Sequence, residues 1–132
     1  PRTSAAALEE WSGPIDLVYV DGKHDTLSCL RDLRWTRHAA PEAPVFVHDS
    51  FSSLGVTLAI LWVALVRGTY RYEGRTGSLA LLRRQRATAA SRARCLAELP
   101  WWVRNLVVKV LLRLRLRRVA AVLGHTDTYD PY

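Results

Sequence analysis

Two short runs of β-branched and aromatic residues each end on acidic and histidine side chains. The first is VYVDGKHD, from Val18 to Asp25, and the second is VFVHDS, from Val45 to Ser50. This composition favours β-strands, and the first strand is predicted to span Ile15–Val20. Because polar residues hardly alternate within it, we expect a strand that is buried on both faces, as in a parallel sheet. Two neighbouring strands would then carry polar groups to one edge of the sheet.

A helix is predicted between these two strands. Residues from Thr26 to Ala39 have leucines at helical spacing, Asp25 or Thr26 can cap the first turn, and two prolines close the segment. The second strand then covers Val45–Val47. A strand, a helix and a second strand form a βαβ unit, which has parallel strands and a right-handed crossover. The leucines on one side of the helix are Leu27, Leu30 and Leu33.

The segment from Leu54 to Val66 is almost wholly apolar. Its 13 residues are too few to cross a hydrocarbon layer of roughly 30 Å. We therefore predict a helix that is buried against the sheet and stops at Gly68. Two strand-like runs follow, Thr69–Tyr72 and Ser78–Leu82, and the residues between them predict an antiparallel hairpin with a five-residue turn, Glu73–Gly77.

The basic residues are concentrated in the second part of the chain. Of the net charge of +7, the stretch from Pro1 to Leu82 contributes almost nothing, with 8 basic and 9 acidic residues. The stretch from Arg83 to Arg118 has 11 basic residues and one acid, Glu98. We interpret residues 1–83 as an α/β unit and residues 84–132 as an Arg-rich helical extension with a polar tail.

Length and composition limit the class of protein. With 132 residues, of which 49% are hydrophobic, the chain is one domain at most and can form a packed core. Cys29 and Cys95 lack the spacing of a zinc site or a disulfide framework, and the first residues lack the apolar run of a secretory signal. We therefore expect a cytoplasmic location. Because the chain begins at Pro1 and contains no methionine, we also expect a piece of a longer protein.

Four polar side chains are expected at the same edge of the sheet. In open α/β sheets, ligands bind outside the carboxyl ends of the strands, where Asp21, His24, His48 and Asp49 would lie. Simpler roles stay open. Asp21 could brace the turn at Gly22, Asp49 could cap the next helix, and both histidines could serve as structural hydrogen-bonding groups. The neighbouring Lys23 is expected to be a solvated loop charge.

Several motifs occur in a fixed order between Ile15 and Arg83. They are DLVYVDGKHD, a helix with LRDL, VFVHDS, and a Gly55-Val56 pair that opens a helix. In this order they resemble the C-terminal half of class I S-adenosylmethionine-dependent methyltransferases. The most similar subgroup has an aspartate-glycine-acid-histidine motif after its fourth strand and a histidine-aspartate pair after its fifth. The predicted hairpin matches the antiparallel sixth and seventh strands of that fold.

The chain departs from this family at three points. Lys23 replaces the acid that the motif usually has, and Pro41-Glu42-Ala43-Pro44 stands where the family has a glycine-rich turn. The sequence contains no G-x-G-x-G loop, because the half of the fold that carries this loop is missing. The resemblance therefore implies an α/β, partial Rossmann-like sheet that, by itself, binds the cofactor poorly and is inactive.

The resemblance also implies roles for the residues at the edge of the sheet. The donor would be S-adenosylmethionine, with Asp21 and Gly22 at the cofactor, and the acceptor would be an oxygen of a small molecule such as a sugar or a natural-product hydroxyl. Some relatives bind a divalent ion at these positions, so Asp21 and Asp49 would hold Mg²⁺, which prefers oxygen ligands. His24, His48 or Asp49 would act in catalysis, since a hydroxyl acceptor must lose a proton. A non-catalytic, truncated remnant is the alternative.

The basic second part predicts a helical segment with an interaction surface. Residues Arg83–Arg94 are expected to form a solvated helix or linker, and a second helix is expected from Val103 to Leu123. Trp101 and Trp102 could anchor this helix at an anionic membrane surface on the inner face of a membrane. Packing against the protein's own core, a partner or a second copy is the alternative, and nucleic acid is not expected because no recognition motif is present.

The charges of that helix form two groups. Lys109, Arg113 and Arg117 would form one stripe, and Arg104, Arg115 and Arg118 would lie on roughly the opposite face, so the predicted helix is imperfectly amphipathic. The final residues, His125 to Tyr132, are expected to be a polar and frayed terminus.

Overall fold

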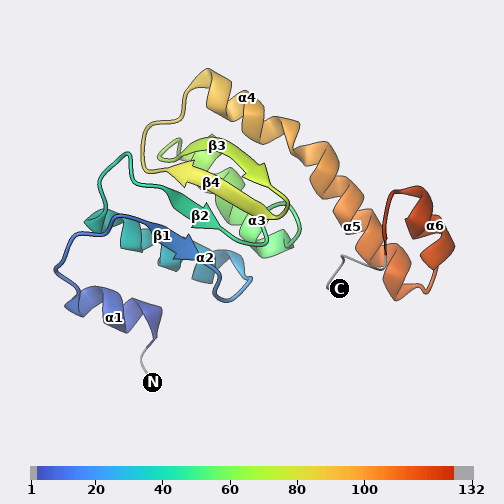
Figure 1. Cartoon of the computed structure of the whole chain (residues 1–132), viewed down its shortest axis with the longest axis horizontal. Helices are drawn as coiled ribbons and strands as arrows, with labels where there is room; N and C mark the ends of the chain where they lie inside the picture. The colour runs from blue at the N-terminus through green and yellow to red at the C-terminus, as the bar shows by residue number, and fades with distance from the viewer. Residues whose placement is uncertain (1–2, 127–132) are drawn as a thin grey trace.

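A four-stranded mixed sheet lies at the centre of the computed structural model, which describes residues 3–126 (Figure 1). Strands β1 and β2 pair in parallel, with Val18 opposite Val45 and Val20 opposite Val47, and β4 is antiparallel to both of its neighbours. The strands are β1 (Val18–Val20), β2 (Val45–Val47), β3 (Arg71–Thr76) and β4 (Leu79–Arg83), in the spatial order β1-β2-β4-β3. The structure thus confirms the predicted partial Rossmann-like α/β sheet with a helical C-terminal part.

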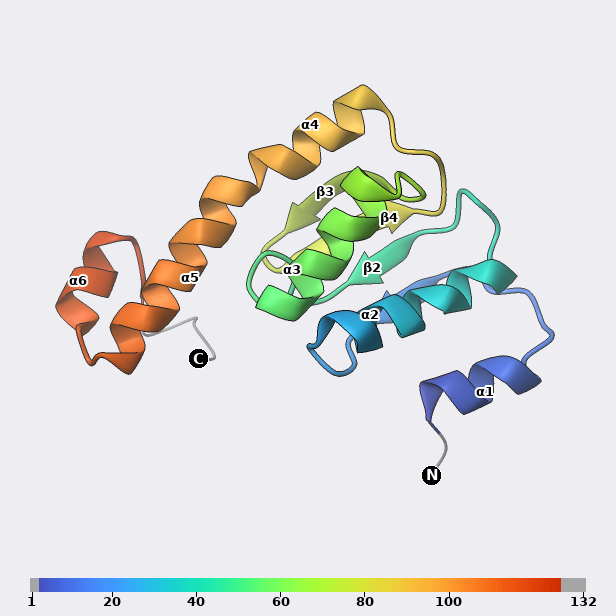
Figure 2. The ribbon, with the colours of Figure 1, turned by 180° about the vertical axis from the view of Figure 1, so that it is seen from behind.

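The helices lie on one face of the sheet and beyond both of its edges. Helices α2 and α3 cover one face, α4 lies along β3, and α6 folds back at the far end of α5 (Figure 2). Helix α2 continues as a 3₁₀ turn, Leu33–His38, and α3 continues as a π-helical turn, Trp62–Val66. The helices are α1 (Ser4–Glu10), α2 (Thr26–Asp32), α3 (Leu54–Leu61), α4 (Ala89–Ala97), α5 (Leu99–Arg113) and α6 (Arg117–Val122).

The core lies between the sheet and helices α2 and α3. The inward side chains of β1 and β2 alternate with Tyr19 and Phe46, which point to the opposite face. Tyr19 is 53% exposed, so the prediction that the first strand is buried on both faces is wrong. Strand β1 is also shorter than predicted, because the predicted start, Ile15, forms only an isolated bridge with Ala39.

The structure confirms two predictions about α2 and α3 and corrects one. The predicted boundaries of the second helix, Leu54 to Val66, match α3 and its π-helical turn, and Gly68 ends it with a φ of 62°. Asp25 caps α2, as predicted, by accepting from the Ser28 backbone N–H. Leu27 does not face the core, since it is 64% exposed and Cys29 takes the buried position.

The predicted five-residue turn between the last two strands is wrong. Strand β3 runs on through Thr76, which pairs with Leu79, so the turn contains only Gly77 and Ser78. Gly77 has a φ of 59°, a conformation that tight hairpin turns need and that glycine adopts without steric cost. A register shift between Tyr72 and Gly74 marks a bulge within β3.

The single acid of the basic segment joins α4 and α5 to the sheet. Glu98 accepts hydrogen bonds from Arg75 Nε at 2.7 Å and from the Tyr72 hydroxyl at 3.1 Å. Both residues lie on β3, and Cys95 of α4 belongs to the same core as the sheet. The predicted domain boundary at Arg83 stays a prediction, although this contact makes α4 part of the packed body.

The predicted helix from Val103 to Leu123 is broken into two. Helix α5 ends at Arg113, Arg115 takes a φ of 60°, and α6 starts at Arg117. The predicted stripe of Lys109, Arg113 and Arg117 therefore does not exist as one helical face. Among the described residues, no helix combines the length and apolarity that crossing a membrane requires.

The predicted frayed end is only partly described. His125 is buried, and its backbone N–H donates to Ala120 O at 3.1 Å, so the polar terminus does not begin there. Residues 127–132 lie outside the described residues.

We predict that Gly55→Ala destabilises the fold. A Cβ at this position would lie 2.8 Å from Asp25 Cα and still closer to His24 O, and neither backbone atom can move without shifting α2. Overpacking of this kind lowers the free energy of unfolding by about 1–3 kcal/mol. Urea denaturation measures the change.

Gly13→Ala is the matched control for this substitution. A Cβ there meets only the Trp11 ring, at the ordinary contact distance of 3.6 Å. Equal stability of the two variants would contradict the close contact between α3 and the loop before α2.

We also predict that both cysteine thiols are unreactive in the folded chain. Burial raises the pKa of Cys29 and of Cys95 to about 12, so at pH 8 almost none of the reactive thiolate is present. Alkylation followed by mass spectrometry should show no modification in buffer and modification of both thiols in denaturant. Rapid labelling of either thiol in buffer would show that its burial is wrong.

Candidate functional site

The site lies where the two parallel strands end. Because Val20 is opposite Val47, the chain leaves both strands at the same level, and the His48 backbone N–H donates to Val20 O at 2.9 Å. Asp21 and His48 therefore follow the last paired residues side by side. This is the place that the sequence predicted for the four polar side chains, and the structure brings all four together.

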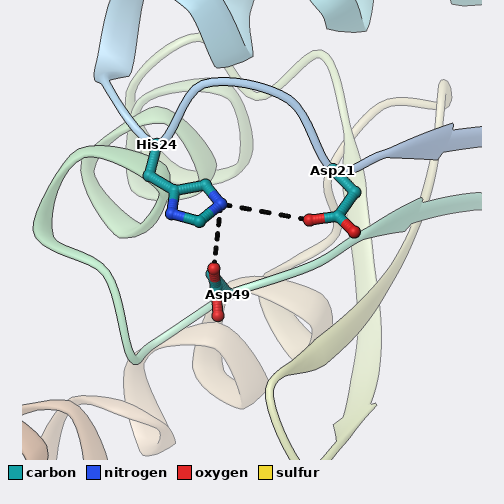
Figure 3. Close-up of side chains that lie close together, drawn as sticks. All are labelled: Asp21, His24 and Asp49. Atoms are coloured by element: carbon teal, nitrogen blue, oxygen red, sulfur yellow. Dashed lines mark ion pairs between the residues drawn. The ribbon is translucent and has the colours of Figure 1, made fainter. Parts of the chain in front are cut away.

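Asp21, His24 and Asp49 form the centre of the cluster (Figure 3). His24 Nε2 lies 3.0 Å from Asp49 Oδ2 and 3.9 Å from Asp21 Oδ1, so the imidazole points between two carboxylates. One donor atom of each of the three residues lies within 4.8 Å of the others. Oxygen and nitrogen atoms at this separation could hold a divalent ion.

His48 completes the cluster on the other side. Its Nδ1 lies 3.3 Å from Asp21 Oδ1 and 3.6 Å from Asp49 Oδ1. The nitrogen is enclosed by protein atoms, yet it makes no hydrogen bond of acceptable geometry within residues 3–126. The contact between His48 Nδ1 and Asp21 Oδ1 is therefore short, but it does not have the geometry of a hydrogen bond. The His48 side chain as a whole is 40% exposed, which leaves the ring accessible.

The loop that carries Asp49 has a strained backbone. Asp49 and Phe51 have φ values of 54° and 55°, and such a conformation costs non-glycine residues about 1–3 kcal/mol each. The side chain of Phe51 is fully buried and packs edge-on against Tyr72, with ring centroids 5.8 Å apart. Burial of this ring thus offsets the strain and fixes the position of Asp49.

Helix α5 supports the same loop from outside the sheet. Asn105 Nδ2 donates to Phe51 O at 2.9 Å, and Lys109 Nζ donates to Ser52 O at 2.6 Å. Sequence reasoning missed both contacts and placed Lys109 in a stripe with Arg113 and Arg117. The signal that could have found them is a pair of polar residues at i and i+4 in an otherwise apolar helix.

The loop that carries His24 is held by the start of α3. Thr26 Oγ1 donates to Gly55 O at 3.0 Å, and Ser53 Oγ donates to His24 O at 3.3 Å. Beside it, hydrogen bonds from the Ser28 backbone N–H and hydroxyl keep the pKa of the capping Asp25 below its ordinary value. The site thus rests on α3 for one histidine and on α5 for one carboxylate.

The simpler roles that the sequence left open for Asp21 and Asp49 were bracing the turn at Gly22 and capping α3. Ser53 is the N-cap residue of α3, and Asp49 contributes its backbone O, which accepts from Ser53 N–H at 2.9 Å. Gly22 packs closely against the carboxylate of Asp32, so a Cβ at this position would lie only 2.8 Å from Asp32 Oδ2. Lys23 is exposed, as expected of a loop charge.

A groove of about 470 Å³ runs along the free edge of β1. Asp21 and Gly22 lie at one end of it, beside the cluster, and Tyr19 and Trp35 contribute aromatic walls. The two residues predicted to contact a cofactor therefore line an open groove, while the two histidines do not.

A family model described as a methyltransferase domain matches residues 2–50. This part of the chain is similar to a methyltransferase domain. The matched stretch contains both parallel strands and ends at Ser50, so it includes all four side chains of the cluster. The match supports methyltransferase activity in general, for which S-adenosylmethionine is the usual methyl donor. No curated protein matches the chain.

We predict that Asn105→Ala loosens the loop after β2. The substitution removes the donor to Phe51 O, so the free energy needed to open the loop locally falls by about 1 kcal/mol. Hydrogen–deuterium exchange should therefore be faster for residues 50–53 and unchanged in the sheet. Val107→Ala, an exposed position on the same helix, is the control and should leave exchange of the loop unchanged. Unaltered exchange in Asn105→Ala would show that α5 does not support the site.

Proposed function

We propose that the chain is the acceptor-side part of a class I S-adenosylmethionine-dependent methyltransferase that methylates an oxygen of a small molecule. The observation that carries this proposal is the cluster of Asp21, His24, His48 and Asp49, which lies inside the stretch that resembles a methyltransferase domain. The antiparallel hairpin after β2 supports the class I subgroup, since that fold ends on such a pair of strands. A sugar or a natural-product hydroxyl is the proposed acceptor.

His48 is the proposed general base. Transfer to a hydroxyl forms an oxygen–carbon bond, breaks the carbon–sulfur bond of the sulfonium, and requires a group that takes the hydroxyl proton. Asp21 lies beside Nδ1 of His48 and would stabilise the imidazolium that forms, which leaves Nε2 to face the acceptor. His24 is turned to Asp49 and Asp21, so it is better placed to orient carboxylates than to reach an acceptor.

S-adenosylmethionine would supply the electrophilic methyl group. Asp21 and Gly22 would lie at this cofactor, because both line the groove along β1. Since the sequence has no G-x-G-x-G loop, we expect weak cofactor binding by this stretch alone. Holding donor and acceptor in line is the main contribution that the edge of the sheet would make.

The same cluster fits a divalent ion. Asp21 and Asp49 offer the oxygen ligands that Mg²⁺ prefers, and the nearby His24 nitrogen makes a mixed set that suits Mn²⁺ better. An ion bound there would lower the pKa of an acceptor hydroxyl. Asp49, which is only 15% exposed and is held by the strained loop, would be the most rigid ligand.

We predict that Asp49→Asn lowers the rate of methyl transfer by at least about 100-fold. The substitution removes the charge that faces His24 and one charged oxygen ligand, and misplacing the reacting groups by about 1 Å can cost a factor of about 100. The measurement follows radiolabelled methyl transfer from excess S-adenosylmethionine to a panel of sugars and phenols, with Mn²⁺ or Mg²⁺ present. Mn²⁺ binding, read by electron paramagnetic resonance, should be lost in the same variant.

His38→Gln is the matched control, since His38 lies outside the cluster, and both its rate and its Mn²⁺ binding should equal the wild type. An unchanged rate in Asp49→Asn would contradict the proposed site, and transfer to amines alone would contradict the acceptor class. Since the sequence has no G-x-G-x-G loop, the folded chain alone can lack both transfer and binding of S-adenosylhomocysteine, and Mn²⁺ binding is then the deciding measurement: equal Mn²⁺ binding in Asp49→Asn and wild type would contradict the proposed site.

A further inference from the structure

The far end of the helical extension exposes apolar side chains that nothing in the described structure covers. We call residues 110–123, the end of α5 with α6, the helical tip. Val110 is 55% exposed, Leu114 is 63% exposed and Val122 is 85% exposed. Leu116 and Val119 are also exposed. The helical tip projects away from the sheet in both views (Figures 1 and 2), so these side chains are not part of the core.

The exposed apolar side chains along α5 share one direction. On α5, Val103, Val107, Val110 and Leu114 follow one another at spacings of four, three and four, which places them in one stripe. The buried Val108 and the loop-binding Lys109 lie on other sides of the helix. The stripe therefore faces away from the site, and α5 has one face for the protein and one without a partner among residues 3–126.

Helix α6 is held firmly in place. Arg104 Nε donates to Leu123 O at 2.6 Å, which ties the end of α6 to α5. Gly124, with a φ of 79°, ends α6 with its N–H donating to Ala121 O, while the His125 N–H donates to Ala120 O. This pair of bonds is the Schellman pattern of a well-formed helix end. The exposed side chains are thus presented on a defined surface.

The charge of this surface has one sign. No acidic residue occurs between Glu98 and Asp127, while six basic residues do. Four of them lie within the helical tip and are exposed: Arg113, Arg115, Arg117 and Arg118. Counted around α6, Arg118, Val119 and Val122 share the side opposite the buried Ala120.

The two tryptophans that the sequence suggested as membrane anchors are engaged elsewhere. The Trp101 ring contacts the guanidinium groups of Arg75 and Arg104, whose Cζ atoms each lie 4.7 Å from its centroid. Trp102 packs against the core of the α/β unit. The exposed side chains left for docking by this extension are therefore chiefly the aliphatic and arginine side chains of the helical tip.

We propose that the helical tip docks on the surface of an anionic lipid bilayer. Exposed aliphatic side chains and exposed arginines in one segment, with no acid among them, fit a layer whose headgroups are negative and whose interior is apolar. A second copy of the chain is a poor fit, because it would place arginines against arginines. The helices are too short to cross the bilayer, so the tip lies in its surface.

The test is co-sedimentation of the full chain with vesicles. Wild-type protein should bind vesicles of phosphatidylcholine mixed with phosphatidylglycerol and should not bind vesicles of phosphatidylcholine alone. Replacing Arg113 and Arg118 with glutamine should weaken binding about 30-fold, since each basic residue near an anionic surface contributes a factor of about five. Val119→Ser with Val122→Ser should weaken it by about tenfold or more. All four positions are exposed, so the variants should fold.

The matched control removes two charges outside the helical tip, one after the π-helical turn of α3 and one before α4. Arg67→Gln with Arg86→Gln has the same net charge as the arginine variant and leaves the tip intact, so it should bind like the wild type. A spin label at Val122→Cys should become accessible to oxygen in anionic vesicles, while one at Ala90→Cys should not. Both labels can be placed selectively because the native thiols are buried.

Three results would overturn the proposal. The first is equal binding to neutral and anionic vesicles or no binding to either, and the second is equal loss of binding in the control and in the arginine variant. The third is self-association in solution, measured by sedimentation equilibrium, that disappears when Val119 and Val122 become serine, because the occupant would then be a second copy.

Discussion

The parallel pairing of Val18–Val20 with Val45–Val47 is the contact on which the rest of this structure depends. Two strands that run in the same direction and in matched register must deliver the residues after them to the same edge. Only three residue pairs make this ladder, yet they bring Asp21 and His48 within 3.3 Å across 27 positions of the sequence. Helices α2 and α3 then cover the inner face of these strands and so stabilise the pairing.

The second part of the chain acts on the site through one loop. The strained backbone at Asp49 and Phe51 needs surrounding contacts that hold it, and they come from the buried Phe51 ring and from two donors on α5. Helix α5 is itself held to β3 by Glu98, the only acid between Arg83 and Arg118. The basic extension is therefore packed against the loop of the site on one side, while its tip faces outward.

Helix α5 takes part in both the proposed site and the proposed membrane contact. One side of α5 supports the loop that carries Asp49, and the other side belongs to the apolar stripe of the proposed membrane contact. Docking of the tip would restrain α5, and the hydrogen bonds of Asn105 and Lys109 would pass that restraint to the loop. The two surfaces can nevertheless be tested separately, because the variants of the tip change no residue that contacts the loop.

Local sequence determined the features that depend on neighbouring residues. The β-branched content of Val45–Val47, the Asp25 cap of α2, and the apolar run that ends at Gly68 were all predictable, since each depends on residues a few positions apart. The tertiary structure alone decided which face of β1 is exposed, because that depends on which helices cover the sheet. It also decided the role of Lys109, the break at Arg115, and the meeting of His24 with Asp49 at 3.0 Å. These features involve groups that are brought together by packing, and the spacing of residues along the chain has no information about such distances.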